Sequence, residues 1–256
     1  MDDRARSAYA QGRLQARHSR RPQAADWRHV EATQDFDHLL ELLRGMTPGR
    51  WTRALAPTAG IHEAEPALRE AWRAHCEEIA GWYAPQWRPA LNWLAWLPWL
   101  PLLESLARGQ PAPPWLQKDP VLSELGTADP ARRLEALTDS PLGALAPEWI
   151  AGGQLDAGWR RAWRELWPED ASARERKLLT RLDAALAAGT MHRTGTAPTV
   201  FANLLETAQR DFNRLFRRAG VGPVAAATWP ALGAIDLARV RAAIARTRLF
   251  GTGSRA

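Results

Sequence analysis

His75 and Cys76 are neighbouring residues whose types could perform nucleophilic or metal chemistry. A cysteine nucleophile needs a histidine within hydrogen-bond reach, and a zinc site needs three or four His, Cys or carboxylate ligands. Neither residue has another His or Cys three or four positions away, which is the spacing that shares a helix face. Because His75 falls on the apolar face of a predicted helix and neither residue has such a partner, we expect a structural role for both.

The other histidines form no complete motif. His62-Glu63 lacks the second histidine of a zinc-binding HExxH site. His29 and His38 are nine residues apart and straddle a predicted helix break, so their spacing does not place them on one helix face. The sequence therefore predicts no metal site.

The remaining signatures of catalysis are also missing. Neither GxxxxGK[ST] nor GxGxxG occurs, and no Gly-x-Ser-x-Gly turn is present. The acidic pairs Asp35/Asp37 and Glu77/Glu78 are interpreted as helix caps and solvated faces. We expect a protein that is not an enzyme and that holds no cofactor, with an enzyme of scattered catalytic residues as a minor alternative.

Arginine supplies nearly all of the net charge of +6, since Lys118 and Lys177 are the only lysines. A GC-rich genome explains such a bias, and the functional alternative is contact with nucleic acid, anionic lipid or an acidic protein face, among which charge alone does not choose. The helix predicted after Val200 carries an apolar stripe on one side and basic residues largely on the others, namely Arg210, Arg214, Arg217 and Arg218. These four are candidate partner-contact residues. Its aromatic residues belong to the apolar stripe, so the pattern does not favour nucleic acid as a partner.

The composition is that of a folded protein in a reducing compartment. Of 256 residues, 46% are apolar, 24% are charged and 14 are tryptophan, which excludes a disordered chain. One cysteine permits no intramolecular disulfide. The first twenty residues lack the apolar core of a signal peptide, and the most apolar stretch, 90–103, is interrupted by Pro98 and Pro101. We expect a cytoplasmic protein.

Helical patterns dominate the chain, and no alternating strand pattern is convincing. Asp35 and Gly45 bracket a short capped helix, and apolar residues recur at helical spacing from Ile61 to Tyr83. We predict an all-α, multi-helical protein. Its helices are expected at 2–21, near Trp27, and at 35–45, 61–83, 85–109 with breaks at Pro98 and Pro101, 156–167, 172–189, 199–220 and 235–250. The tryptophans at 72, 82, 87, 93, 96 and 99 are expected in the core.

The chain also contains an internal repeat. Asp35–Trp51 matches Asp129–Leu145 with an offset of 94 residues, and LREAWR at 68–73 matches WRRAWR at 159–164. The proline-rich segment QPAPPW is the best candidate boundary. We therefore predict a first helical unit at 1–109, a connector at 110–118 and a second unit at 119–256, with a remnant of a third after Val200.

These residues resemble the central-stalk subunit of rotary V/A-type ATPases, called C in archaea and bacteria and d in eukaryotes. That family opens on Tyr-x-x-x-Arg-(Val/Leu)-x-Ala, followed by a short leucine-rich helix and a turn. The matching residues are Tyr9, Arg13, Leu14, Ala16, Arg17 and Ser19, then Asp35, Leu39, Leu40, Leu43, Thr47, Pro48 and Gly49, and later Leu103, Leu106, Arg108 and Gly109. The Asp and Asn of a later family motif are replaced near Trp99 and Leu102.

The resemblance implies a non-catalytic, funnel-like helical adaptor. Such a subunit couples the membrane rotor ring to the central shaft during proton or sodium ion transport, and it reaches the membrane only through its partners. Tyr9, Arg13 and Arg17 join the candidate contact residues on this basis. The alternative is a soluble helical interaction scaffold with a basic docking face, unrelated to ATPases.

Overall fold

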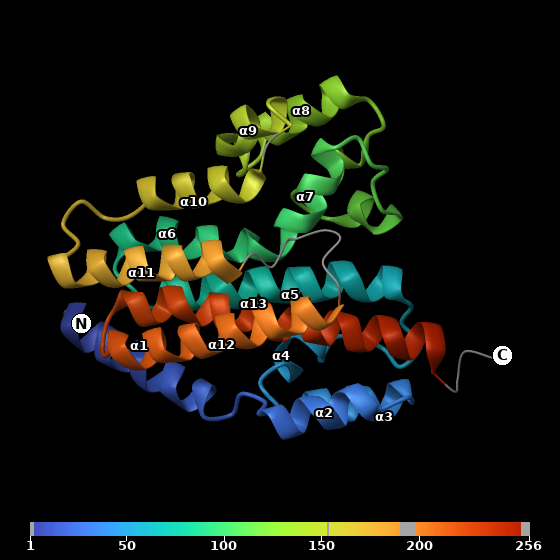
Figure 1. The fold of residues 1–256 in the computed structure, drawn as a ribbon, viewed down its shortest axis with the longest axis horizontal. Coiled ribbons are helices and arrows are strands. Elements are labelled where there is room, and N and C mark those ends of the chain that lie inside the picture. Colours follow the sequence, from blue (N-terminus) through green and yellow to red (C-terminus); the bar gives the residue numbers. More distant parts are fainter. Residues whose placement is uncertain (1–2, 153, 190–197, 252–256) are drawn as a thin grey trace.

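The computed structural model describes residues 3–152, 154–189 and 198–251. Within these ranges helices are joined by turns and loops, and no strand occurs (Figure 1). This confirms the predicted all-α class. The first half contains α1 (Asp3–His18), α2 (Ala24–Ala32), α3 (Phe36–Arg44), α4 (Gly49–Thr52), α5 (Ile61–Gly81), η1 (Pro85–Trp87), α6 (Arg88–Trp93), η2 (Leu94–Trp99) and α7 (Leu100–Ala107).

The second half begins with the short helices η3 (Pro114–Lys118), η4 (Ser123–Gly126), α8 (Pro130–Asp139), η5 (Gly143–Leu145) and α9 (Ala146–Ile150). Longer helices follow: α10 (Leu155–Glu165), α11 (Ala173–Gly189), α12 (Pro198–Ala219) and α13 (Pro223–Phe250). In Figure 1, α5 and α13 run through the middle of the molecule, with α1 to α4 on one side and α7 to α10 on the other.

Local sequence signals set several helix ends. The carboxylate of Asp35 accepts a hydrogen bond from the backbone N–H of His38 at 2.8 Å, and Asp129 accepts one from Ala131 at 2.9 Å. Both satisfy N–H groups that a helix start leaves free. Gly109, with φ of 78°, ends the helical run after α7, where the sequence predicts a break.

One predicted boundary is wrong. The sequence indicates a break from Gly220 to Pro230, but α13 begins at Pro223 and contains Pro230 inside it. Every residue from Pro223 to Leu237 is buried. Burial of this alanine-rich segment against its neighbours outweighs the cost of an internal proline, a tertiary effect that local propensity does not report.

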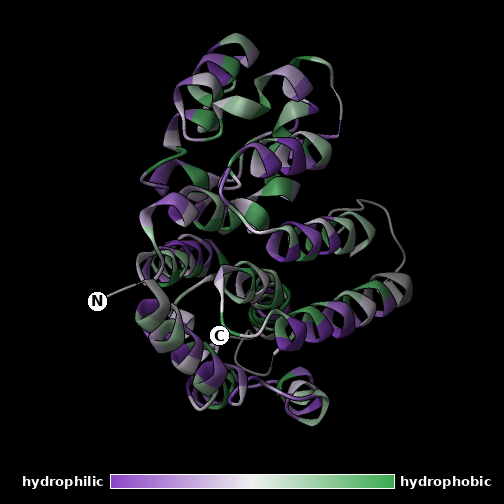
Figure 2. Cartoon of the chain, turned by 90° about the vertical axis from the view of Figure 1, so that its left-hand side faces the viewer, coloured by the Kyte–Doolittle hydropathy of each residue, from purple (hydrophilic) through white to green (hydrophobic). Residues whose placement is uncertain are grey.

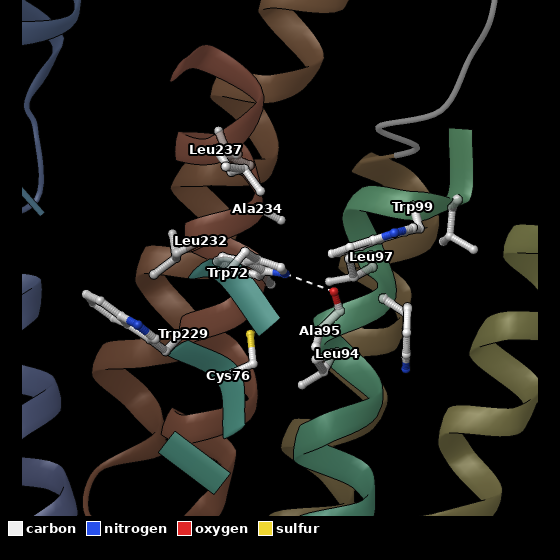
Figure 3. Packing of buried hydrophobic residues seen from close by; sticks show 14 of the residues in the cluster. Trp72, Cys76, Leu94, Ala95, Leu97, Trp99, Trp229, Leu232, Ala234 and Leu237 are labelled. Carbon is white, nitrogen blue, oxygen red and sulfur yellow. Dashed lines mark hydrogen bonds between the residues drawn. The ribbon is translucent and has the colours of Figure 1, made fainter. Parts of the chain in front are cut away.

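The core lies where α13 packs against α5 and η2 (Figure 3). The indole N–H of Trp72 donates to the backbone carbonyl of Ala95 at 2.8 Å, as the dashed line in Figure 3 shows. Gly233 faces the Trp72 ring, and a Cβ placed there would lie only 2.7 Å from the ring. Glycine at this position therefore allows the two helices to approach closely.

A second group of tryptophans joins α6 to α10. Trp93 and Trp159 stack with ring centroids 6.2 Å apart, and Trp159 and Trp163 stack at 6.1 Å. The Trp93 indole donates to the carbonyl of Trp159, and the Trp163 indole donates to that of Ala90, both at 3.0 Å. Among the six tryptophans predicted for the core, all are buried except Trp82, which is half-buried.

The segment 110–118 packs on the first unit. Trp115 and Leu116 are buried, and the Arg69 guanidinium lies between the rings of Trp99 and Trp115, 4.8 and 4.7 Å from their centroids. Arg73 donates to Asp119 at 2.9 Å in a buried ion pair. The described core is continuous across this segment, and the division into two units stays a prediction.

Matching positions of the repeat occupy matching geometry. A Cβ on Gly49 would collide with the carbonyl of Arg44, five residues earlier, and one on Gly143 would collide in the same way with Thr138. Glu65 pairs with Arg69 at 3.3 Å, and at the matched positions Asp156 lies 3.5 Å from Arg160. These correspondences favour the duplication. The funnel shape implied by the resemblance stays a prediction.

Candidate partner-contact surfaces

The motif residues of α1 meet a single carboxylate on α5. Tyr9, Arg13 and Arg17 follow each other at four-residue spacing, which places them on one helix face. Arg13 donates to the Tyr9 hydroxyl at 3.0 Å and to Glu78 at 3.2 Å. Arg17 donates to both oxygens of Glu78, at 2.7 and 2.9 Å. The sequence interpretation of Glu78 as part of a solvated face misses this contact.

Glu78 forms ion pairs with more than one cation. Arg50 on α4 lies 3.7 Å from its second oxygen, so three guanidinium groups share one half-exposed carboxylate. The guanidinium carbons of Arg13 and Arg17 stack over the half-buried Trp82 ring at 4.4 and 4.5 Å. Burial lowers the pKa of Arg17, and the nearby charges of Arg50 and Arg13 lower it further, while Glu78 raises it.

The three α1 candidates therefore differ in accessibility. The Tyr9 side chain is 54% exposed and Arg13 is 40% exposed, whereas Arg17 is only 7% exposed. Tyr9 and Arg13 can meet a partner directly. Arg17 holds Glu78 and Trp82 in place beneath them.

The C-terminal end of α1 connects this region to α12 and α13. The His18 ring stacks on Phe216 with centroids 4.5 Å apart, and its Nε2 lies 3.0 Å from the Asn213 side-chain oxygen. Arg21 donates two hydrogen bonds of 2.8 Å to Asp236, and both side chains are buried. The N-terminal motif is thus tied to the core helix by a buried ion pair.

The four arginines predicted as contact residues on α12 are all exposed. Within the described chain, Arg214 pairs with Asp211 at 3.3 Å, and Arg210 bonds locally to the Glu206 carbonyl and the Thr207 hydroxyl. Leu205, Ala208, Phe212 and Leu215 are buried on the opposite side, as the apolar stripe predicts. Phe201, which the sequence assigns to the same stripe, lies outside the described side chains.

A second basic stripe was not recognised from the sequence. Arg174, Lys177 and Arg181 are exposed on α11 at spacings of three and four residues, so they share one helix face. The spacing itself was the available signal. This stripe lies beside a second basic helix because α11 and α12 pack side by side (Figure 2).

His75 and Cys76, whose residue types could perform chemistry, occupy structural positions. The indole N–H of Trp229 donates to His75 Nε2 at 3.0 Å, and burial lowers the pKa of His75 to about 3. Burial also raises the pKa of the Cys76 thiol, which keeps the sulfur protonated and unreactive. This supports the structural role expected for both residues.

His29 and His38 come closer than their sequence spacing suggests, with ring centroids 6.1 Å apart. The break between α2 and α3 folds one helix back beside the other, so residues on different helices become neighbours. No cluster of three or more potential metal ligands occurs among the described residues.

Three hollows on the described surface are small. Two adjacent hollows of about 220 Å³ lie beside the end of α13, and both include Gln34 and Thr247. A third, of about 300 Å³, is lined by Glu124, Thr127, Arg132, Glu135, Ala136 and Asp139. Each of these three volumes lies at or below the lower end for small-molecule sites.

Comparison with known proteins returned no match to any protein family, to any curated protein or to any solved structure. Within the described residues, no helix is both long enough and apolar enough to cross a membrane.

Proposed function

We propose that this chain is a non-catalytic adaptor that joins other protein subunits, in the manner of the central-stalk subunit of rotary V/A-type ATPases. The observation that carries the proposal is the exposed basic surface of α12, formed by Arg210, Arg214, Arg217 and Arg218 opposite its buried face. An exposed row of cations on one helix is suited to binding an acidic surface of another macromolecule.

The placement of the resembling residues supports this role. The Thr47 hydroxyl, in the turn that the resemblance identifies, donates to the backbone carbonyl of Arg17 on α1 at 3.3 Å. Gly49 follows in the same turn, where the Arg44 backbone leaves no space for a Cβ. Two segments that resemble the family are therefore in direct contact, and the turn requires the small residue found there.

A mechanical adaptor must transmit force without local unfolding. Ion pairs join different helices within the described core and suit that requirement. Arg21, just after α1, pairs with Asp236 of α13, and Arg241 of α13 pairs with Glu65 of α5 at 2.8 Å. Arg69 pairs with the same Glu65 and is buried between two indoles. Bidentate and stacked arginines fix geometry more strictly than apolar contacts alone.

Sedimentation with membranes tests this function. Membranes from cells that contain the native protein are washed gently, pelleted and probed for this chain and for ATPase subunits. The adaptor role predicts that the chain pellets with the ATPase and is released together with its soluble sector. A chain that stays in the supernatant while the intact ATPase pellets would contradict the role.

The second candidate is a helical scaffold unrelated to ATPases. The same basic surface favours it, because charge complementarity does not depend on the identity of the assembly. Stable recovery with other soluble proteins, in the absence of ATPase subunits, would support this candidate instead.

A further inference from the structure

We propose that the α11–α12 pair is a docking surface for an acidic α-helix of a partner protein. The inference rests on the proposed adaptor role only for the assumption that the partner is a protein. The surface consists of two stripes: Arg174, Lys177 and Arg181 on α11, and Arg210, Arg214, Arg217 and Arg218 on α12.

The α12 stripe points away from the core. Arg210, Arg214 and Arg217 are spaced by four and three residues, which keeps them on one face. The buried residues Phe212 and Leu215 lie on the other side of the helix. Arg217 has no acidic partner among the described residues, and Arg214 has only Asp211, one turn away on its own helix.

The α11 stripe reaches the α12 stripe at one end. Arg174 donates to the backbone carbonyl of Arg218 at 3.5 Å, which joins the start of α11 to the end of α12. The two helices run in opposite directions with the same rise per residue. Lys177 therefore lies level with the turn around Arg214, and Arg181 lies level with the turn around Arg210. Figure 2 shows the two helices extending together from the body of the molecule.

The charge on this pair is poorly balanced. The described parts of α11 and α12 contain eight cationic side chains and four carboxylates. Of those carboxylates, Asp183 is already paired with Arg164 of α10 at 2.8 Å, and Glu175 accepts from Ser172 at the helix start. The surface thus presents an excess of positive charge that its own residues do not neutralise.

The spacing fits a helix as the occupant. Cations four residues apart on α12 are separated by ~6 Å along the axis. Carboxylates at four-residue spacing on a partner helix repeat at the same distance, so several ion pairs form at once when the two axes align. An acidic helix resting along the α11–α12 pair would meet both stripes, as amphipathic helices do in grooved surfaces.

The described side chains of α11 and α12 offer neither exposed apolar groups for insertion into lipid nor exposed aromatics for stacking on single strands, which favours a protein as the partner. The exposed large apolar residues of the described chain are Tyr9, Val121, Ile150, Val221, Leu249 and Phe250, and none belongs to α11 or α12. A surface helix that inserts into a membrane interface needs apolar side chains that enter the bilayer, whereas basic side chains alone attach only to anionic headgroups. Binding of single strands needs exposed aromatics for stacking, but Phe212 and Phe216 are buried.

Fluorescence anisotropy with the full chain tests the proposal. The probe is a labelled, helix-forming peptide with glutamates at every fourth position, and a second peptide has the same composition with the glutamates scattered around the helix. The variant of the α11–α12 surface, named the hairpin variant, carries Arg181→Gln, Arg214→Gln and Arg217→Gln. The matched control variant carries Arg28→Gln, Arg53→Gln and Lys118→Gln, three exposed positions elsewhere. Both variants lose the same charge, so a general electrostatic effect weakens them equally.

The proposal predicts that the hairpin variant binds the first peptide about tenfold more weakly than the control variant does. It also predicts that the protein prefers the first peptide to the scattered one. Equal losses in both variants would overturn it. So would tighter binding of phosphatidylserine vesicles or of a single-stranded oligonucleotide that the hairpin variant loses selectively. If the peptide experiment overturns this proposal, the membrane sedimentation result still stands. The docking surface and the adaptor role can therefore fail independently.

Discussion

Trp229 on α13 donates its indole N–H to Nε2 of His75 on α5, across 3.0 Å in the buried core. An indole nitrogen can only donate, so Nε2 must accept and carries no proton. The contact therefore fixes the neutral imidazole with its proton on Nδ1, which lies 3.8 Å from Glu78. Burial acts in the same direction and lowers the pKa of His75 to about 3.

This hydrogen bond predicts a specific pH dependence of stability. In the unfolded chain a histidine takes up a proton near its ordinary pKa of 6.5, whereas folded His75 resists protonation down to about pH 3. The unfolded state therefore binds more protons between these values, and the stability contribution is lost as pH falls from 6.5 towards 3. In a His75→Gln variant the slope of unfolding free energy against pH should be shallower by about 1 kcal/mol per pH unit. Urea unfolding across this range measures it, and parallel curves would refute the assignment.

Close packing of α13 on α5 predicts the effect of filling Gly233. A methyl group there meets the Trp72 ring, and the hydrogen bond to Ala95 hinders that ring from moving away. Gly233→Ala should lower the unfolding free energy by about 1–3 kcal/mol. Gly12→Ala on α1 is the matched control, because no atom lies within 4 Å of its Cβ position. Alanine there should stabilise the helix by about 0.5–1 kcal/mol, so an equal effect of both substitutions would contradict the packing described.

The shared carboxylate on α5 predicts unequal roles for two adjacent glutamates. Glu78→Gln leaves the buried Arg17 and its neighbours Arg13 and Arg50 without their common anion, and should lower the unfolding free energy by about 2 kcal/mol. Glu77→Gln changes an exposed side chain and should stay within about 0.5 kcal/mol of wild type. Chemical denaturation of both variants at low salt provides the measurement. Equal stabilities would show that Glu78 is only a solvated residue.

The pair of Arg21 and Asp236 predicts a non-additive response. Arg21→Met alone leaves a buried carboxylate without its partner and should cost about 3–5 kcal/mol. Combining it with Asp236→Leu removes the stranded carboxylate, so the double variant should be more stable than the sum of the two single effects predicts. A double-mutant cycle by denaturant unfolding measures the coupling. Strict additivity would show that the two side chains do not act as a pair.

Features that depend on local sequence could be predicted, and those that depend on tertiary contact could not. The Asp35 cap follows from residue type and position, and the apolar spacing of α5 follows from helical period. In contrast, Arg73–Asp119 joins residues 46 apart, and Arg21–Asp236 joins residues 215 apart. Nothing in the local pattern selects one carboxylate among many for such pairs.

The candidate surfaces show the same division. The exposure of Arg210 and Arg214 follows from their position opposite the apolar stripe and was predicted. The burial of Arg17 beneath Arg13 could not be, because it depends on Trp82 and Glu78 of a different helix. The α11 stripe comes to lie beside the α12 stripe only through the packing of the two helices, which local sequence does not show.

The most direct test of the adaptor role is recovery of partners by the tagged full chain under mild detergent, identified by mass spectrometry. We expect rotor-ring and central-shaft subunits to be recovered with the wild type and with the Arg28/Arg53/Lys118 control variant, and to be reduced with the folded Arg181/Arg214/Arg217 variant. Recovery of unrelated soluble proteins alone, with no ATPase subunit under these conditions, would contradict the rotary adaptor role and leave the helical scaffold as the account of this protein.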